Sequence, residues 1–187
     1  RRRALDDLPF LDRELFYSST RLGRFPMRSF MVSRGCPYKC TYCFNHKYNL
    51  LYKGKGALHS RMSVERVISE LKELKSRYET QFIKFYDDIF VMKDDEWLDE
   101  FSERYPVEIG LPFHCLMRAN LLTEPILLKL KKAGLASMSM SIESGNDRVR
   151  NEVLKRNMTK ETLIEAFDLC HKHNVPTFSN TIFAIPG

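Results

Sequence analysis

The sequence lacks any long hydrophobic run. No segment approaches the ~20 consecutive apolar residues that a membrane-spanning helix needs. Its first ten residues, RRRALDDLPF, lack the apolar stretch of a secretory signal peptide. From these absences we expect a cytoplasmic protein with no membrane partner.

Blocks of one charge are also scarce, and cysteines are few. The 30 basic residues outnumber the 24 acidic ones, but beyond the first three arginines this excess is not clustered. We therefore expect a small-molecule or peptide substrate rather than nucleic acid. The five cysteines are an odd number, and three of them fall between positions 36 and 43. This pattern argues against a disulfide scaffold and for a metal site in a reducing compartment.

Strand and helix patterns alternate from residue 28 onward. Helical patterns near residues 63–78, 94–105, 123–133 and 159–173 separate five strand patterns, which cover Arg28–Arg34, Phe82–Tyr86, Pro112–Met117, Ala136–Glu143 and Val175–Ile185. Strands joined by helices predict parallel β/α units with right-handed crossovers. We therefore predict an α/β fold, a partial parallel (β/α) barrel, with its chemistry at the carboxyl ends of the strands.

The two ends of the chain differ from this alternating region. Residues 4–27 carry Pro, Asp and scattered aromatic residues without periodicity, so we predict a linker over 1–27 that packs on a core domain over 28–187. The chain begins without Met and stops directly after an apolar run. We expect a piece of a longer protein whose core is truncated at its C-terminus.

The segment GCPYKCTYCFN places Cys36, Cys40 and Cys43 directly after the first predicted strand, with the spacing CxxxCxxC. Three thiolates on a short loop can hold three corners of a cubane iron–sulfur cluster and leave one iron open for a reacting ligand. The alternative is a zinc site with His46 as the fourth ligand, in a binding module without catalysis. Structural zinc sites usually add a second ligand pair much later, and the two remaining cysteines are isolated.

This cysteine loop, with the aromatic Tyr42 before its last cysteine, resembles the signature of the radical S-adenosylmethionine (radical SAM) enzymes. The resemblance covers roughly Phe25 to Gly187 and implies five of the usual six β/α units. The segments LDDLPFLDREL, CFNHKYN, LYKGKG and VLKRNMT are similar to the branch of the family that carries a cobalamin-binding domain upstream.

The resemblance implies that the three cysteines ligate a 4Fe–4S cluster and form the catalytic centre. It also implies contacts with S-adenosylmethionine at nine further positions. These are Tyr42, Asp87, Asp88, Arg118, Glu143, Arg156, Asn180, Ala184 and Ile185.

At the ends of the second and third strands the implied contacts have structural alternatives. Asp87 and Asp88 match the place where the family binds the amino group of the methionine moiety, but they would also suit a turn that caps the next helix. Arg118 suits an anionic group of the cofactor or of the substrate, or an exposed position on the rim.

The later strands supply the remaining implied contacts. The resemblance implies ribose contacts for Glu143 and Asn180. It implies a methionine-carboxylate contact for Arg156, with Lys155 as the substitute, and adenine packing for the segment from Ala184 to Gly187. Glycines usual in the family are replaced by Ser141 and Ala184.

The reaction that the resemblance implies begins when S-adenosylmethionine chelates the open iron. An electron, delivered to the cluster by a donor such as flavodoxin or ferredoxin, cleaves the sulfonium and leaves a 5′-deoxyadenosyl radical that removes hydrogen from an unactivated carbon. Cobalamin, held by a domain absent from this chain, would then serve methylation or rearrangement. A tRNA-modifying, methylthiotransferase-like enzyme is the alternative within the family.

Overall fold

A five-stranded parallel sheet forms the centre of the computed structural model, which describes residues 4–185. The strand order β1-β4-β5-β6-β7 follows the order along the chain. The strands are β1 (Met27–Phe30), β4 (Phe82–Phe85), β5 (Phe113–Leu116), β6 (Leu135–Ser139) and β7 (Thr177–Phe178). The predicted fold class, a partial parallel β/α barrel, is confirmed.

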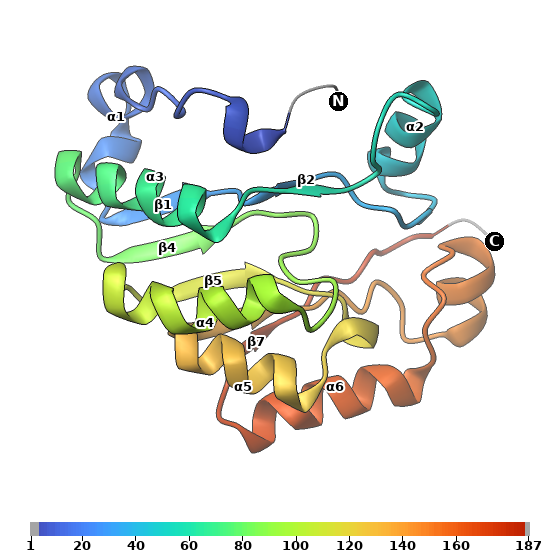
Figure 1. Cartoon of the computed structure of the whole chain (residues 1–187). Helices are drawn as coiled ribbons and strands as arrows, with labels where there is room; N and C mark the ends of the chain where they lie inside the picture. The colour runs from blue at the N-terminus through green and yellow to red at the C-terminus, as the bar shows by residue number, and fades with distance from the viewer. Residues whose placement is uncertain (1–3, 186–187) are drawn as a thin grey trace.

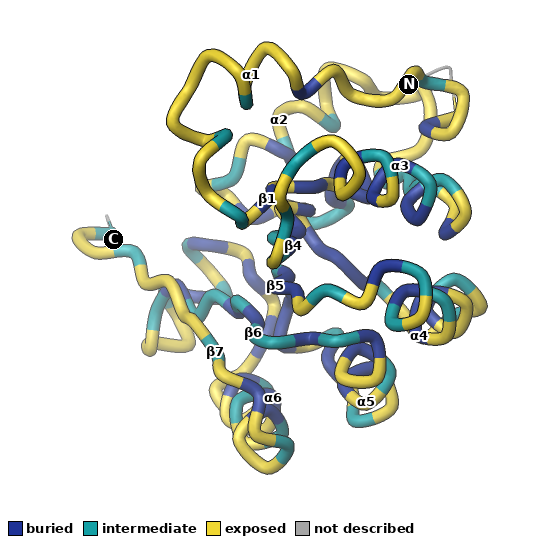
Figure 2. The backbone as a smooth tube through the Cα atoms, turned by 90° about the vertical axis from the view of Figure 1, so that its left-hand side faces the viewer, coloured by how far each residue is buried: buried dark blue, intermediate teal, exposed yellow. Residues whose placement is uncertain are grey.

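Four helices connect successive strands of this sheet. They are α3 (Val64–Arg77), α4 (Glu96–Glu108), α5 (Glu124–Ala133) and α6 (Lys160–Lys172). Figures 1 and 2 show α3, α4 and α5 along one side of the sheet, with α6 beside β7. The hydroxyls of Ser63 and Thr159 accept hydrogen bonds from the first turns of α3 and α6, as expected of N-cap residues. The opposite face of the sheet remains free for a site.

The alternation of side chains along the strands gives the two faces different characters. On β4, Ile83 and Phe85 are fully buried toward the helices. There Phe85 packs edge to face against Phe101 of α4 and Phe113 of β5. The alternate residue of β4, Lys84, lies on the free face. The apolar face therefore supplies the packing energy, while the other face keeps polar groups.

The first predicted strand is divided, which corrects the prediction of one continuous strand over Arg28–Arg34. Its second part, β2 (Ser33–Arg34), leaves the parallel sheet and pairs antiparallel with β3 (Ser60–Arg61). The cause is the buried carboxylate of Asp87, which accepts hydrogen bonds from the amides of Val32 and Ser33 at 3.1 and 2.6 Å. These amides are therefore unavailable to the sheet ladder.

Two other predicted strands end earlier than expected. The strand predicted over Ala136–Glu143 stops at Ser139, and Glu143 has a left-handed backbone with φ of 63°. Beyond Phe178 the last predicted strand continues only as one isolated parallel bridge, between Glu143 and Thr181. Short elements that the periodicity did not predict are α2 (Phe44–Leu51), η3 (Ala119–Leu121) and a π-helical turn, η4 (Val149–Val153).

The segment before β1 folds into η1 (Leu5–Asp7), α1 (Glu14–Ser19) and η2 (Arg21–Arg24). Arg13 forms a 2.8 Å ion pair with the buried carboxylate of Glu70 on α3. Arg28 is also buried and donates to the carbonyls of Leu22 and Glu79, both at 2.8 Å. The segment is thus held against the core, while a domain boundary at residue 27 stays a prediction. None of the helices within residues 4–185 is long and apolar enough to cross a membrane.

Helix α5 provides a test of the local backbone. Gly134 ends α5 with φ of 109°, a conformation that costs an L-residue about 1–2 kcal/mol. We therefore expect Gly134→Ala to lower the free energy of unfolding by about that amount in a urea titration. Gly145, where a Cβ would meet nothing within 4 Å and φ is not positive, is the matched control. Equal effects at the two glycines would contradict this account of the turn.

Asp87 provides a second test, based on pH. Burial raises its pKa from 3.8 to about 6, although hydrogen bonds from Ser33 and Val32 oppose the shift. As the pH rises through this interval, the unfolded chain releases the proton before the folded chain does, so this group lowers stability. Between pH 4 and pH 7, the free energy of unfolding of Asp87→Asn should therefore rise relative to that of the wild type by ~2–3 kcal/mol. Asp168→Asn, at an exposed site, controls for the lost carboxylate, and parallel pH profiles for wild type and Asp87→Asn would refute the expectation.

Candidate active site

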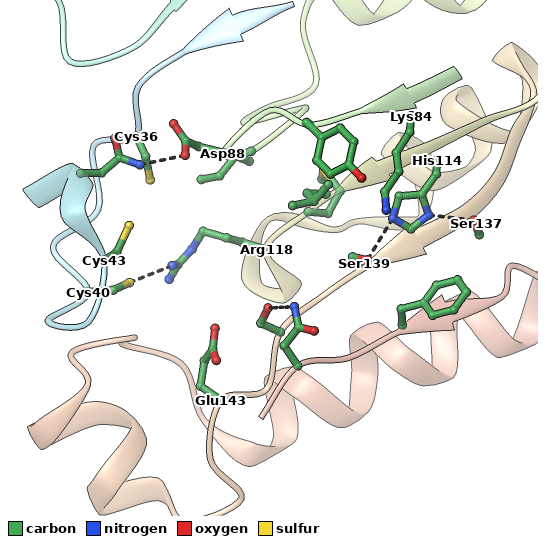
Figure 3. A pocket seen from close by; sticks show the side chains of 18 of the residues that line it. Cys36, Cys40, Cys43, Lys84, Asp88, His114, Arg118, Ser137, Ser139 and Glu143 are labelled. Atoms are coloured by element: carbon green, nitrogen blue, oxygen red, sulfur yellow. Dashed lines mark hydrogen bonds between the residues drawn. The ribbon is translucent and has the colours of Figure 1, made fainter. Parts of the chain in front are cut away.

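A cavity of about 630 Å³ lies on the free face of the sheet. Its wall includes residues from all five strands and from the cysteine loop. Nine of the twelve site residues predicted from the sequence line it, namely Cys36, Cys40, Tyr42, Cys43, Asp88, Arg118, Glu143, Arg156 and Asn180. Figure 3 shows the cysteines on one side of this cavity, facing the Arg118 side chain. The structure thus brings together residues that lie more than 140 positions apart in the sequence.

The cysteine loop is held in shape by its own backbone and by α2. The amide of Cys43, the N-cap residue of α2, donates to the carbonyl of Cys40 at 3.1 Å. The side chain of Asn49 on α2 donates to the carbonyl of Cys36 at 2.7 Å. Thr41 anchors the far side of the loop, because its hydroxyl donates to a carbonyl of the η4 turn. The three thiols are therefore presented by a supported loop at the carboxyl end of the sheet.

The Arg118 guanidinium is the main cation beside the thiols. It is buried, lies 3.5 Å from the sulfur of Cys40 and packs over the ring of Tyr38, with 3.6 Å from its central carbon to the ring centroid. Burial raises the pKa of the Cys36 thiol, whereas Arg118 acts to lower it. A cation at this position favours the thiolate form that metal binding requires.

The donor set matches a sulfur-ligated cluster better than a four-ligand zinc site. Thiolates are soft ligands that suit both iron–sulfur clusters and zinc. His46, the alternative fourth ligand, does not line the cavity, and its Nδ1 lies 2.6 Å from the carbonyl of Cys43. Across residues 4–185, no three His, Cys, Asp or Glu side chains already converge closely enough to hold a metal ion. The fit therefore rests on three thiols of one loop that face one cavity.

At the cysteine end of the cavity, Tyr42 of the cysteine loop joins a network with the buried side chains of Glu143 and Arg156. The hydroxyl of Tyr42 donates to Glu143 at 2.8 Å and accepts from Arg156 at 2.8 Å. Arg156 and Glu143 also form an ion pair at 3.6 Å, and burial raises the pKa of Tyr42. The Nε of Arg156 is buried and has no hydrogen-bond partner. This network therefore retains an unused donor at the cavity wall.

Arg150, which the sequence analysis missed, organises the loop that carries this network. It is fully buried, donates to the carbonyls of Ser144 and Met158 at 2.7 and 2.9 Å, and pairs with Asp147. The loop so closed presents Arg156 to the cavity and leaves Lys155, the predicted substitute, exposed. No spacing pattern marks Arg150, because its partners are mostly backbone carbonyls.

The two aspartates after β4 have separate positions. Asp88 lines the cavity and accepts from the Asn45 side chain at 2.8 Å. Asp87 points away from the cavity and binds the β2 backbone. Neither caps the following helix, whose N-cap is Asp95. Of the pair, only Asp88 is placed to meet a ligand in this cavity.

The last strand contributes less to the wall than the sequence predicted. Asn180 lines the cavity and donates to the hydroxyl of Ser141 at 3.3 Å. Ala184 and Ile185 do not line it. Ala184 has φ of 55°, a conformation that favours glycine, and glycine is usual at this position in the family that the sequence resembles. The final two residues of the predicted adenine-binding segment, Pro186 and Gly187, lie outside the described residues.

A second polar group, also missed as a site, lies deeper on the same wall. His114 contacts the hydroxyls of Ser137 and Ser139 at 2.7 and 2.9 Å from its two ring nitrogens. Burial lowers the pKa of His114, and the nearby Lys84 lowers it further. Ser137 and Ser139 alternate with the fully buried Met138 along β6, and both line the cavity beside His114.

Comparison with known proteins agrees with this geometry. The model of the Radical SAM superfamily matches residues 30–187. An uncharacterized methyltransferase of Pyrococcus horikoshii is 26% identical over 97% of the chain. Cytidylyl-2-hydroxyethylphosphonate methyltransferase of Streptomyces wedmorensis is 28% identical over 70% of the chain. The chain spans 38% and 23% of the length of these two relatives.

Solved structures share the fold. The radical S-adenosylmethionine methyltransferase TsrM of Kitasatospora setae, with tryptophan substrate and a SAM analog bound, aligns with a TM-score of 0.73 at 19% identity. That alignment covers 100% of this chain and 34% of TsrM. Methylornithine synthase (PylB) aligns with a TM-score of 0.62 at 16% identity, over 92% of this chain and 51% of PylB.

The family match covers most of the chain, including the cysteine loop and every cavity-lining residue except Met27. The predicted family is therefore confirmed, and the chain belongs to the radical SAM superfamily.

Proposed function

We propose that this chain is the catalytic core of a radical SAM methyltransferase, in which Cys36, Cys40 and Cys43 hold a 4Fe–4S cluster. The observation that carries the proposal is the placement of three thiols of one supported loop at the carboxyl end of a parallel sheet, facing a cavity lined by two carboxylates and two buried arginines. When bound, such a cluster supplies the electron that cleaves S-adenosylmethionine to a 5′-deoxyadenosyl radical.

The proposed work of the protein side chains is to bind and orient S-adenosylmethionine. The Asp88 carboxylate suits its ammonium group, and the unpartnered Nε of Arg156 suits its carboxylate, because both pairs gain charge-assisted hydrogen bonds. Glu143 and Asn180 offer an acceptor and an amide for the ribose hydroxyls. Asp87 instead fixes the backbone that leads into the cysteine loop.

Four further residues have indirect roles in this proposal. Tyr42 holds Glu143 and Arg156 in place through its hydroxyl. Ala184 and Ile185 lie outside the present cavity, so adenine packing on them requires the segment after β7 to approach the site. In this proposal Arg118, which lies beside Cys40, stabilises the negative charge of the thiolates.

Methylation, with cobalamin bound by a domain outside this chain, is the finer part of the proposal. Its support is the methyltransferase names of both relatives and the TsrM structure solved with cobalamin and a [4Fe-4S] cluster. An electron donor such as flavodoxin or ferredoxin, in a reducing cytoplasm, would complete the system. The second candidate is a tRNA-modifying radical SAM enzyme. Salt-dependent binding of RNA would favour this candidate.

The triple variant Cys36→Ala, Cys40→Ala, Cys43→Ala tests the proposal. After anaerobic reconstitution with iron and sulfide, and reduction with dithionite, we expect the wild type to form 5′-deoxyadenosine from S-adenosylmethionine. The triple variant should form none above background, because no thiolate remains to hold the cluster. Product is measured by chromatography.

Cys170→Ala is the matched control, because Cys170 is buried and does not line the cavity. It should retain both the cluster and the product. Zinc bound in place of iron, or 5′-deoxyadenosine formed equally by the triple variant, would overturn the assignment.

A further inference from the structure

The inner end of the cavity carries polar side chains that no proposed cofactor contact uses. Lys84 of β4 is the register partner of His114 on β5, which is in turn the partner of Ser137 on β6. With Ser139 they form a group that we call the floor cluster (Lys84, His114, Ser137 and Ser139). All four line the same cavity as the thiols. In Figure 3 the floor cluster lies at the opposite end of the cavity from the cysteines.

The floor cluster is separated from the proposed cofactor contacts along two neighbouring chain segments. Asp88 lies four positions after Lys84, and Arg118 lies four positions after His114. At ~3.3 Å per extended residue, this places the floor cluster up to about 13 Å from the cysteine end. A second ligand can therefore occupy the floor while its other end reaches toward the cofactor.

The charge of the floor favours an anion. Among the described residues, Lys84 has no recorded ion pair, and its ammonium lies 4.7 Å from the centroid of the Tyr86 ring. The acids that line the cavity, Asp88 and Glu143, are both at the cysteine end. The ammonium thus faces a shared space in which no carboxylate of the floor balances it.

The hydrogen bonds of His114 leave one serine hydroxyl near this cation with an available proton. A neutral imidazole donates from one ring nitrogen and accepts at the other. Of the two serine hydroxyls that contact His114, one therefore accepts from the ring and keeps its own O–H proton available. That proton and the Lys84 ammonium are two donors that line the same cavity, and an oxyanion can accept hydrogen bonds from both.

Apolar groups border the same region. Phe178 of β7 packs against the His114 ring with a centroid distance of 5.7 Å, and Met27 and Phe82, register partners at the start of their strands, also line the cavity. Few polar groups combined with apolar walls are typical of small-molecule sites.

We propose that the floor cluster binds an anionic group, a carboxylate or a phosphoryl group, of a small-molecule substrate. This assignment rests on the proposed function, because it takes the cysteine end of the cavity to be occupied by S-adenosylmethionine. Binding of the anion at the floor directs the rest of the substrate toward the cofactor and so selects the carbon that reacts.

The test follows the His114 imidazole signals by NMR during titration with inorganic phosphate and, separately, with acetate. Sodium chloride at matched ionic strength controls for screening, and the His114→Asn spectrum assigns the signals. We expect at least one anion to shift the His114 signals saturably. Stronger binding of phosphate indicates a phosphoryl group, and stronger binding of acetate indicates a carboxylate.

Lysine variants decide whether the floor cluster is responsible. Lys84→Met should weaken anion binding by about tenfold or more, because a hydrogen bond to a charged group is lost. Lys84→Arg, which keeps the cation, should stay within a few-fold of the wild type and guards against misfolding of the first variant. Lys93→Met makes the same charge change at an exposed residue away from the cavity and should leave binding unchanged.

The absence of a saturable His114 shift with both anions, or equal binding by Lys84→Met and the wild type, would overturn the proposal. The titrations are run on the chain before and after reconstitution with iron and sulfide. Anion binding therefore has a readout separate from 5′-deoxyadenosine formation, and either proposal can fail without the other.

Discussion

The buried guanidinium of Arg118 is the contact on which the arrangement of the site depends. A cation removed from water needs hydrogen bonds and compensating charge. Arg118 donates to the carbonyl of Arg156 at 2.7 Å, contacts the sulfur of Cys40 and packs on the ring of Tyr38. It thereby joins the end of β5 to the cysteine loop and to the loop after β6. No ion pair is recorded for it within residues 4–185, so the thiolates of a bound cluster would supply the negative charge beside it.

The division of the sheet into two unlike faces explains how this buried charge is tolerated. The helix-covered face contains the fully buried Phe85 and Phe113, and it supplies the hydrophobic stabilisation. The free face carries polar side chains in two tiers, with the network of Glu143 and Arg156 at the carboxyl end and His114 with its serines deeper in the cavity. Because side chains alternate along a strand, the same short strands provide both the core and the site.

The fold and the cysteine loop could be predicted because their signals are local. The spacing of Cys36, Cys40 and Cys43 and the alternation of strand and helix patterns depend on neighbouring residues alone. The division of the first strand could not be predicted, because it depends on the carboxylate of Asp87, more than fifty positions away.

The internal pairing of the site could not be read from the sequence either. Arg150 acts mainly through backbone carbonyls, which no residue pattern reveals. The contact of His114 with two serines depends on the register between β5 and β6, including its irregularity after Phe113. The sequence therefore predicts which residues line the carboxyl end of the sheet better than it predicts which of them bind each other.

The central claim is that three thiols hold a cluster with one iron left open for S-adenosylmethionine. The most direct test is the iron-57 Mössbauer spectrum of the reconstituted chain, recorded with and without S-adenosylmethionine. We predict a 4Fe–4S spectrum in which addition of S-adenosylmethionine changes the parameters of one iron site and leaves the other three unchanged. Identical spectra in the two samples, or a chain that retains zinc and no iron, would contradict the claim.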